Sequence, residues 1–197
     1  GAPAFAQGYQ TSTADTWLKQ ASPNENHGSD KELSVKNKPG DNFRTLYLFD
    51  ISSIPAGANV TRAELRLRVT GEDDSEEPVN IYRVTDAWSE NTANWNNTGN
   101  DYDASVVHAS FVPDDTGWVR IDISSLVQSW VCGEFPNHGF MLIATSDDTE
   151  SKYTSKEWDQ GNRRPRLYLQ SSGTNPCPGA AQPEILADWP LDDCTLG

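Results

Sequence analysis

Apolar and polar side chains alternate along much of this chain with the two-residue period of a β-strand. Between positions 61 and 70 every second residue is apolar, namely Ala63, Leu65, Leu67 and Val69. The residues between them are charged, namely Arg62, Glu64, Arg66 and Arg68. Because successive side chains of a strand point to opposite faces, this pattern predicts a sheet with one buried face and one face in water. Such sheets are typical of antiparallel sandwiches.

Turn signals such as Pro39-Gly40 and Asn137-His138-Gly139 separate further segments of this kind. The candidate strands are residues 15–19, 32–37, 44–50, 61–70, 79–84, 105–111, 118–123, 140–144, 153–158 and 166–170. Many short strands divided by turns predict an all-β fold, and we expect an antiparallel jelly-roll β-sandwich.

A single segment, residues 125–131, has the period of a helix. Leu126, Val127 and Trp130 share one apolar face of it. Ser124 precedes the segment and is predicted to cap its first turn, while Gly133 follows it and is predicted to end the helix. The predicted fold therefore contains one short helix.

Composition divides the chain into three parts. Residues 1–13 are predicted to form an extended leader, and residues 14–170 the jelly-roll domain. From Ser171 the chain is rich in Ser, Gly, Pro and Ala, which is typical of a linker. Residues 171–197 are therefore predicted to hold a linker and the start of a following segment. Cys177 and Cys194 could form a disulfide, which would leave Cys132 free or paired with another chain.

The chain is strongly acidic. It has 15 Lys and Arg residues against 29 Asp and Glu residues, for a net charge of −14. This balance argues against nucleic acid or an anionic membrane as the partner, because phosphate binding depends on basic surface. No apolar stretch approaches the roughly 20 residues of a membrane-spanning helix. The acidity is explained by solubility or by acids that gather around calcium, and both explanations can hold together.

Several motifs follow one another in a fixed order along residues 14–169. They include 14–18 (ADTWL), 44–50 (RTLYLFD), 81–90 (IYRVTDAWSE), 121–130 (IDISSLVQSW), 137–140 (NHGF), 154–157 (TSKE) and 163–167 (RRPRL). In their order and spacing these motifs resemble the DNRLRE-type domains, which are grouped with carbohydrate-binding modules and disaggregatase-related repeats. The tail from Ile185 onwards is similar to the opening of a concanavalin-like (LamG-type) domain.

The resemblance implies a secreted or cell-surface module of an extracellular multidomain protein. Domains of this family often stand beside enzymes that act on acidic polysaccharides, and some are associated with alginate-like or uronic-acid polymers. We therefore expect a polysaccharide or glycoconjugate as the partner. Catalysis is not expected, because His27, His108 and His138 lie far apart and no His-Glu-x-x-His or Gly-x-Ser-x-Gly motif is present. An unrecognised glycosidase stays an alternative, since two facing carboxylates suffice for one.

Aromatic side chains are the candidates for sugar contact, because sugar rings stack on aromatic faces. Trp17, Trp118 and Trp130 fall on apolar faces and are predicted to lie in the core. Trp88 and Trp95 bracket a polar loop, where a structural anchor is slightly favoured over a ligand contact. The leading ligand platform is Trp158, with these neighbours in the sequence: Tyr153, Lys156, Arg163 and Arg164.

Arg66 and Arg68 lie on the outward face of their predicted strand. Their guanidinium groups are suited to uronate carboxylates. The alternative is an ordinary cross-strand ion pair with the abundant acids.

Calcium is the expected cofactor. Asp15 opens the first candidate strand, Asn24 and Glu25 offer oxygen atoms in a loop, and Glu157 lies on a late strand. First and late strands of a jelly roll can be neighbours, so these groups are predicted to bind structural calcium together. The alternative is a set of Asx-turns and hydrogen bonds at strand ends.

These observations predict a non-catalytic extracellular module that binds polysaccharide, specifically acidic, uronate-containing glycans, with structural calcium. The alternative is a structural subunit of an extracellular filament, sheath or adhesin. In that case the terminal segments would mediate self-association by adding a strand to a neighbouring sheet.

Overall fold

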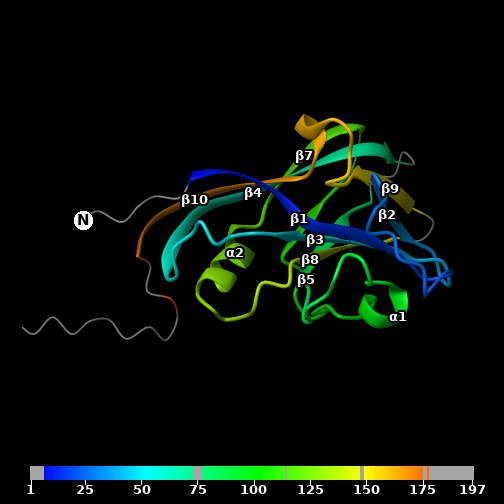
Figure 1. The fold of residues 1–197 in the computed structure, drawn as a ribbon, viewed down its shortest axis with the longest axis horizontal. Coiled ribbons are helices and arrows are strands. Elements are labelled where there is room, and N and C mark those ends of the chain that lie inside the picture. Colours follow the sequence, from blue (N-terminus) through cyan, green and yellow to red (C-terminus); the bar gives the residue numbers. More distant parts are fainter. Residues whose placement is uncertain (1–6, 73–76, 114, 147–148, 175–176, 178–197) are drawn as a thin grey trace, which may run out of the picture.

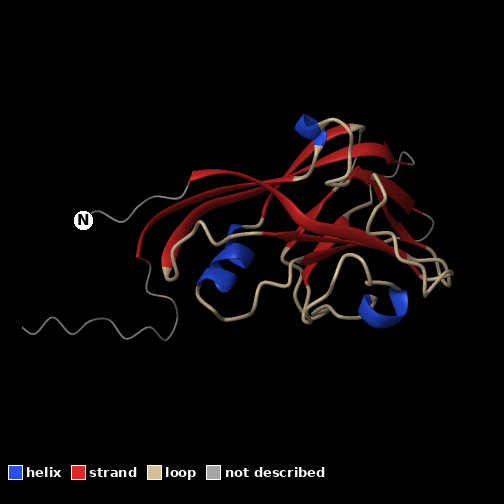
Figure 2. Cartoon of the chain, viewed as in Figure 1, coloured by secondary structure: helices blue, strands red, loops and turns tan. Residues whose placement is uncertain are grey.

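The computed structural model describes residues 7–72, 77–113, 115–146, 149–174 and 177. Its strands are β1 (Gln7–Lys19), β2 (Glu32–Asn37), β3 (Phe43–Phe49), β4 (Ala58–Glu72), β5 (Val79–Arg83), β6 (Ala109–Phe111), β7 (Gly117–Asp122), β8 (Phe140–Ala144), β9 (Thr149–Thr154) and β10 (Arg166–Thr174). Its helices are α1 (Trp95–Thr98), α2 (Ser124–Val131) and the 3-10 turn η1 (Gly161–Arg163). The prediction of a β-rich fold is confirmed (Figure 2).

The strands pair in antiparallel fashion as one continuous ten-stranded sheet. Six of them close into a ring in the order β1, β10, β4, β9, β2, β3 and back to β1. Strands β8, β5 and β6 continue from β3, while β7 pairs with β4 (Figure 1). The predicted jelly-roll sandwich is not confirmed, because hydrogen bonds join the strands in a closed ring rather than in two separate sheets.

The main core lies inside the ring. The alternation predicted for β4 is confirmed, since Leu65 and Leu67 are fully buried and Arg66 is partly exposed on the opposite face. A second, smaller apolar cluster lies on the other side of β3 and β8, where the loop of residues 84–102 covers Leu46 and Met141. In this way β3 is buried on both faces.

Several predicted boundaries move in the structure. The strand expected at 153–158 is β9 at Thr149–Thr154, because Ser155 instead begins a turn in which it accepts a hydrogen bond from the Trp158 backbone N–H. The predicted leader contributes to the sheet, since Gln7 to Thr11 pair with β10. The LamG-like start and residues 1–6 lie outside the described residues.

The prediction of a single helix is corrected by α1, a one-turn helix. Asn94 and Asn97 exchange side-chain to backbone hydrogen bonds there, in a capping box too short to leave a period in the sequence. Helix α2 forms as predicted, but Ser124 is not its cap. The Ser124 hydroxyl donates to Asp122 and accepts from the Ala63 N–H. No helix in the described part of the chain is long and apolar enough to cross a membrane.

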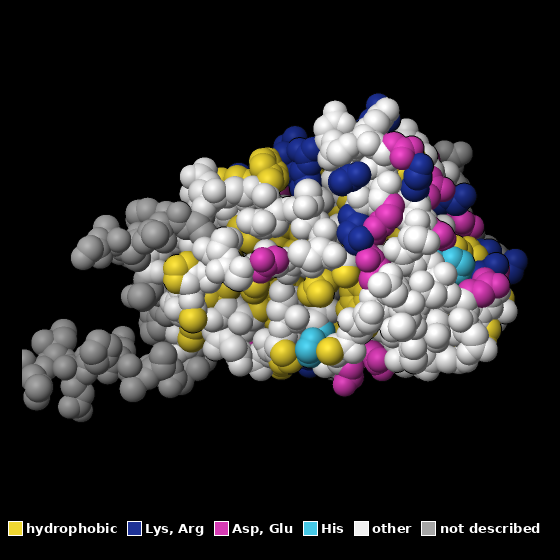
Figure 3. Space-filling model, viewed as in Figure 1, with side chains coloured by type: hydrophobic (Ala, Val, Ile, Leu, Met, Phe, Trp, Pro, Cys, Tyr) yellow, Lys and Arg dark blue, Asp and Glu magenta, His cyan; other side chains and the backbone are white. Residues whose placement is uncertain are grey.

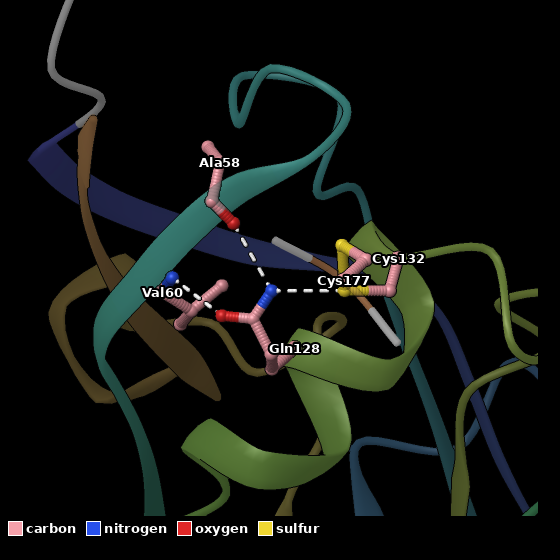
Figure 4. Close-up of a disulfide and its surroundings, with 5 residues drawn as sticks. All are labelled: Ala58, Val60, Gln128, Cys132 and Cys177. Carbon is pink, nitrogen blue, oxygen red and sulfur yellow. Dashed lines mark hydrogen bonds between the residues drawn. A yellow bond between two sulfur atoms is a disulfide. The ribbon is translucent and has the colours of Figure 1, made fainter. Parts of the chain in front are cut away.

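A disulfide joins Cys132, at the end of α2, to Cys177, beyond β10 (Figure 4). The sequence left the pairing of the three cysteines open, and the structure pairs Cys177 with Cys132 rather than with Cys194. Beside it, the Gln128 amide donates to the Ala58 carbonyl at 3.0 Å and accepts from the Val60 N–H at 2.8 Å. The Gln128 side chain thus joins α2 to the start of β4, and the bridge joins Cys177 to α2.

Candidate functional site

The outward face of four neighbouring strands is arranged in rows of polar and aromatic side chains. Residues paired across antiparallel strands share a face, so the pairing of β1, β10, β4 and β7 defines the rows. One row is Gln7, Gln170 and Arg62, and the next is Tyr9, Tyr168, Glu64 and Asp122. The third is Thr11, Arg166, Arg66 and Arg120, and a fourth holds Arg68 and Trp118. We call these residues the arginine face.

Aromatic rings and guanidinium groups contact one another across the arginine face. The Arg66 guanidinium lies 4.9 Å from the Tyr9 ring centre, and the Arg62 guanidinium lies 5.3 Å from that of Tyr168. The rings of Tyr9 and Tyr168 meet edge to face at 5.1 Å. These contacts hold the rings in place, since a cation within about 6 Å of a ring centre is attracted to it.

Trp118 is exposed on this face, which corrects its predicted place in the core. It is 39% exposed, and the guanidinium groups of Arg68 and Arg166 each lie 6.0 Å from its ring centre. Tyr9 is exposed by 47%. Two large rings, each beside arginine, are therefore open to solvent on one side of an otherwise acidic protein.

The arginine face is positively charged although the whole chain is acidic. It gathers five of the chain's nine arginines, with Glu64 and Asp122 as its acidic members. Arg62 and Arg66 both pair with Glu64. The predicted alternative for Arg66, an ion pair, is thus present, although along one strand rather than across two. In Figure 3, Lys and Arg side chains lie along the upper part of the view near β7, and others lie among Asp and Glu side chains toward β9 and β2.

The residues predicted around Trp158 are not part of the rows of the arginine face, although their loop adjoins it through a hydrogen bond from Arg166 to the Gly161 carbonyl. Trp158, Arg163 and Arg164 belong to the loop between β9 and β10, where the Arg164 Nε donates to the Trp158 carbonyl at 2.9 Å. Their contact with a ligand stays a prediction. The prediction that Tyr153 contacts a ligand is wrong, because this side chain is fully buried and cannot reach the surface. Its hydroxyl lies 2.8 Å from that of Ser151.

Trp88 and Trp95 pack against the second apolar cluster, in agreement with the favoured role as loop anchors. The Trp88 indole N–H donates to the His138 carbonyl at 2.8 Å. Trp130 is buried in the main core as predicted, whereas Trp17 is only partly buried there and stacks on His27.

A second group of side chains brings together three carboxylates, which we call the carboxylate cluster. Asp15 comes from β1, Glu90 from the loop after β5 and Glu157 from the turn after β9, and one oxygen of each lies within 4.8 Å of the others. The Lys156 ammonium pairs with Glu90 at 2.9 Å and also with Glu157. Burial by itself would lower the pKa of Lys156, but these hydrogen bonds raise it, so this lysine is charged.

Asp15 is the most buried member of the carboxylate cluster. Burial raises its pKa to about 7, and the nearby charges of Glu157 and Glu90 act in the same direction. Its Oδ2 accepts hydrogen bonds from the Ser12 hydroxyl at 2.7 Å and from the Lys156 backbone N–H at 3.0 Å, which lower the pKa in part.

The predicted calcium ligands are only partly brought together. Asp15 and Glu157 belong to the carboxylate cluster, and Glu90 joins them although it was not predicted as a ligand. Asn24 and Glu25 do not belong to it. Asn24 accepts from the Asn96 amide at 2.8 Å, and Glu25 lies 3.7 Å from the His27 ring nitrogen.

The loop that carries Asn24 and Glu25 instead holds the backbone of Glu90. The Asn26 amide donates to the Glu90 carbonyl at 2.7 Å and to the Ala93 carbonyl at 2.8 Å. Gly28 packs so closely that a Cβ there would lie 2.2 Å from the Glu90 carbonyl oxygen. The loop therefore fixes where Glu90 meets Asp15, whose backbone N–H donates to the Glu90 carboxylate.

Replacing Gly28 with alanine should lower the free energy of unfolding by about 2 kcal/mol, because the added methyl group must push the Glu90 backbone away. Urea denaturation followed by tryptophan fluorescence measures this change. Gly161→Ala is the control, since a Cβ at that position meets no atom within 4 Å. Equal denaturation midpoints for the two variants would show that the Glu90 loop moves aside without a loss of stability.

A family model described as carbohydrate-binding module family 96 matches residues 6–171. The chain is also similar to bone morphogenetic protein 4 of Oryctolagus cuniculus, with 31% identity over 150 residues. That similarity covers 72% of this chain and 34% of the relative, so the chain spans about a third of the relative's length. The family match includes both the arginine face and the carboxylate cluster.

Proposed function

This chain belongs to carbohydrate-binding module family 96, and on that premise we propose that it binds acidic, uronate-containing polysaccharide on the arginine face. The observation that carries the proposal is the gathering of five arginines and two exposed aromatic rings on one outward sheet surface of a chain with a net charge of −14. We further propose that the module works outside the cell, where its disulfide is stable, and that it binds without catalysis.

The chemistry of the arginine face matches both parts of a uronate. The C–H face of a sugar ring packs on an aromatic ring, for which Tyr9 and Trp118 are open. The carboxylate of a uronate accepts two parallel hydrogen bonds from one guanidinium group, a geometry that lysine cannot provide. Because Arg62 and Arg66 share the single carboxylate of Glu64, they keep donors for a second anion.

The shape of the arginine face also favours a polymer over a single sugar. The rows run across four strands, and neighbouring strands are about 4.8 Å apart, so the face is roughly 14 Å wide. A chain of several sugar residues is needed to cover that width.

The proposal predicts strong retardation of the protein in native gels that contain alginate and no retardation in gels that contain neutral dextran. Raising the salt to about 0.5 M should weaken alginate binding severalfold, because ions screen the attraction between guanidinium groups and carboxylates. The same protein without polymer gives the reference mobility. Equal retardation by both polymers, or retardation that salt leaves unchanged, would refute the acidic specificity.

A further inference from the structure

We propose that the carboxylate cluster of Asp15, Glu90 and Glu157 is a binding site for a divalent cation, with calcium as the preferred ion. The site would be structural and distinct from the arginine face. It differs from the ligand set expected from the sequence, because Glu90 takes the place of Asn24 and Glu25.

The spacing of the three carboxylates fits one ion. Oxygen ligands of calcium lie about 2.3–2.6 Å from the metal, so two ligands of one ion are at most about 5 Å apart. One oxygen from each of the three side chains meets this limit, with mutual distances within 4.8 Å. Because all three donors are carboxylates, the site favours hard cations such as calcium over zinc or copper, which prefer nitrogen or sulfur.

Two buried oxygen atoms of the carboxylate cluster lack hydrogen-bond partners among the described residues. They are Asp15 Oδ1 and Glu157 Oε2. Asp15 is only 1% exposed, so bulk solvent does not reach this carboxylate. A buried carboxylate oxygen without a donor is costly. A cation bound between Asp15 and Glu157 would remove that cost.

Lys156 neutralises only part of the negative charge. Its ammonium contacts Glu90 and Glu157, whereas Asp15 receives the backbone N–H of Lys156 and not its ammonium. The ammonium and a bound cation would therefore share two carboxylates. It follows that removing the ammonium should strengthen cation binding, whereas a cluster that Lys156 alone satisfies would only become less stable.

Thermal unfolding of the intact chain without polysaccharide tests the site. The weakest-binding extracellular calcium modules have dissociation constants of about 1 mM, so about 10 mM calcium is roughly ten times that value. At this concentration the melting temperature should be about 3 °C higher than in the presence of a chelator. Terbium, a luminescent substitute for calcium, should bind saturably. Both signals should disappear in Glu157→Gln and persist in Glu25→Gln, a matched change outside the cluster.

Lys156→Met separates the proposal from a cluster satisfied by lysine alone. The proposal predicts that this variant binds terbium about tenfold more tightly than the unaltered chain. The proposal is overturned if the unaltered chain shows neither a calcium-dependent melting temperature nor saturable terbium luminescence. It is also overturned if Glu25→Gln loses both signals together with Glu157→Gln. The calcium and terbium measurements on the unaltered chain test the proposal even if Lys156→Met fails to fold.

Discussion

Replacing Trp118 with alanine should weaken alginate binding at least tenfold and leave the fold intact. The ring is 39% exposed at the edge of the arginine face, so its removal takes away stacking area without opening a cavity in the core. Tryptophans that act as hot spots of binding surfaces commonly contribute about 2 kcal/mol, which corresponds to roughly thirtyfold in affinity, and for Trp118 at the edge of the face we expect at least tenfold. Affinity electrophoresis in alginate gels, with the melting temperature measured in parallel, gives both quantities.

Variants of the loop between β9 and β10 provide matched controls for this prediction. Trp158→Ala changes the same residue type at the position favoured by sequence alone, and we expect a much smaller loss of affinity. For charge, Arg66→Gln should weaken binding severalfold, whereas Arg163→Gln on η1 should not. If Trp158→Ala abolishes binding and Trp118→Ala does not, the ligand lies on the loop and the arginine face is not the site.

Reducing or removing the disulfide between Cys132 and Cys177 should cost about 4 kcal/mol of the free energy of unfolding. The bridge closes a separation of 45 residues, and closing a loop of that length in the unfolded chain has an entropic effect of this size. Guanidinium denaturation of Cys132→Ser and of the unaltered chain with and without reductant measures it. Identical midpoints in all three samples would show that the packing of α2 alone holds this part of the chain.

Alginate binding by the reduced protein serves as the control for this change. Helix α2 packs on the inner side of the sheet through Leu126 and Val127, whereas the arginine face is on the outer side. While the reduced chain stays folded, its affinity should therefore remain within about twofold of the oxidised form. A larger loss would mean that the bridge also shapes the binding surface.

The two faces of β4 were predictable because alternation is a local property of the sequence. The strands that pair with β4 were not predictable, because strand order depends on contacts between residues far apart in the sequence. Tyr168, for example, pairs with Tyr9 on one side and with Glu64 on the other. For Trp118 the same local alternation indicates the outward face. Trp118 has the same parity as Arg120 and Asp122, which places it on the polar face, while Ile121 is buried.

The carboxylate cluster was predictable only in part. Asp15 and Glu157 lie on segments that a β fold can bring together, but Glu90 lies in a long loop without a period. Its position depends on Asn26 and Gly28, whose contacts with the Glu90 backbone leave no trace in the sequence pattern. Likewise, three cysteines permit three pairings, and the pairing of Cys132 with Cys177 depends on α2 packing on the start of β4, which pairs with the end of β10.

Strands from both ends of the chain build the arginine face, with Tyr9 on β1 and Tyr168 on β10 as direct neighbours. A glycan held there would bridge the first and last strands of the closed ring, so opening the ring at this seam would require release of the glycan. Saturating polymer, at about one hundred times the dissociation constant, would add roughly 2.7 kcal/mol to the stability of the native state. Attachment to its polysaccharide would thus make the module more resistant to heat and proteases than it is when free in solution.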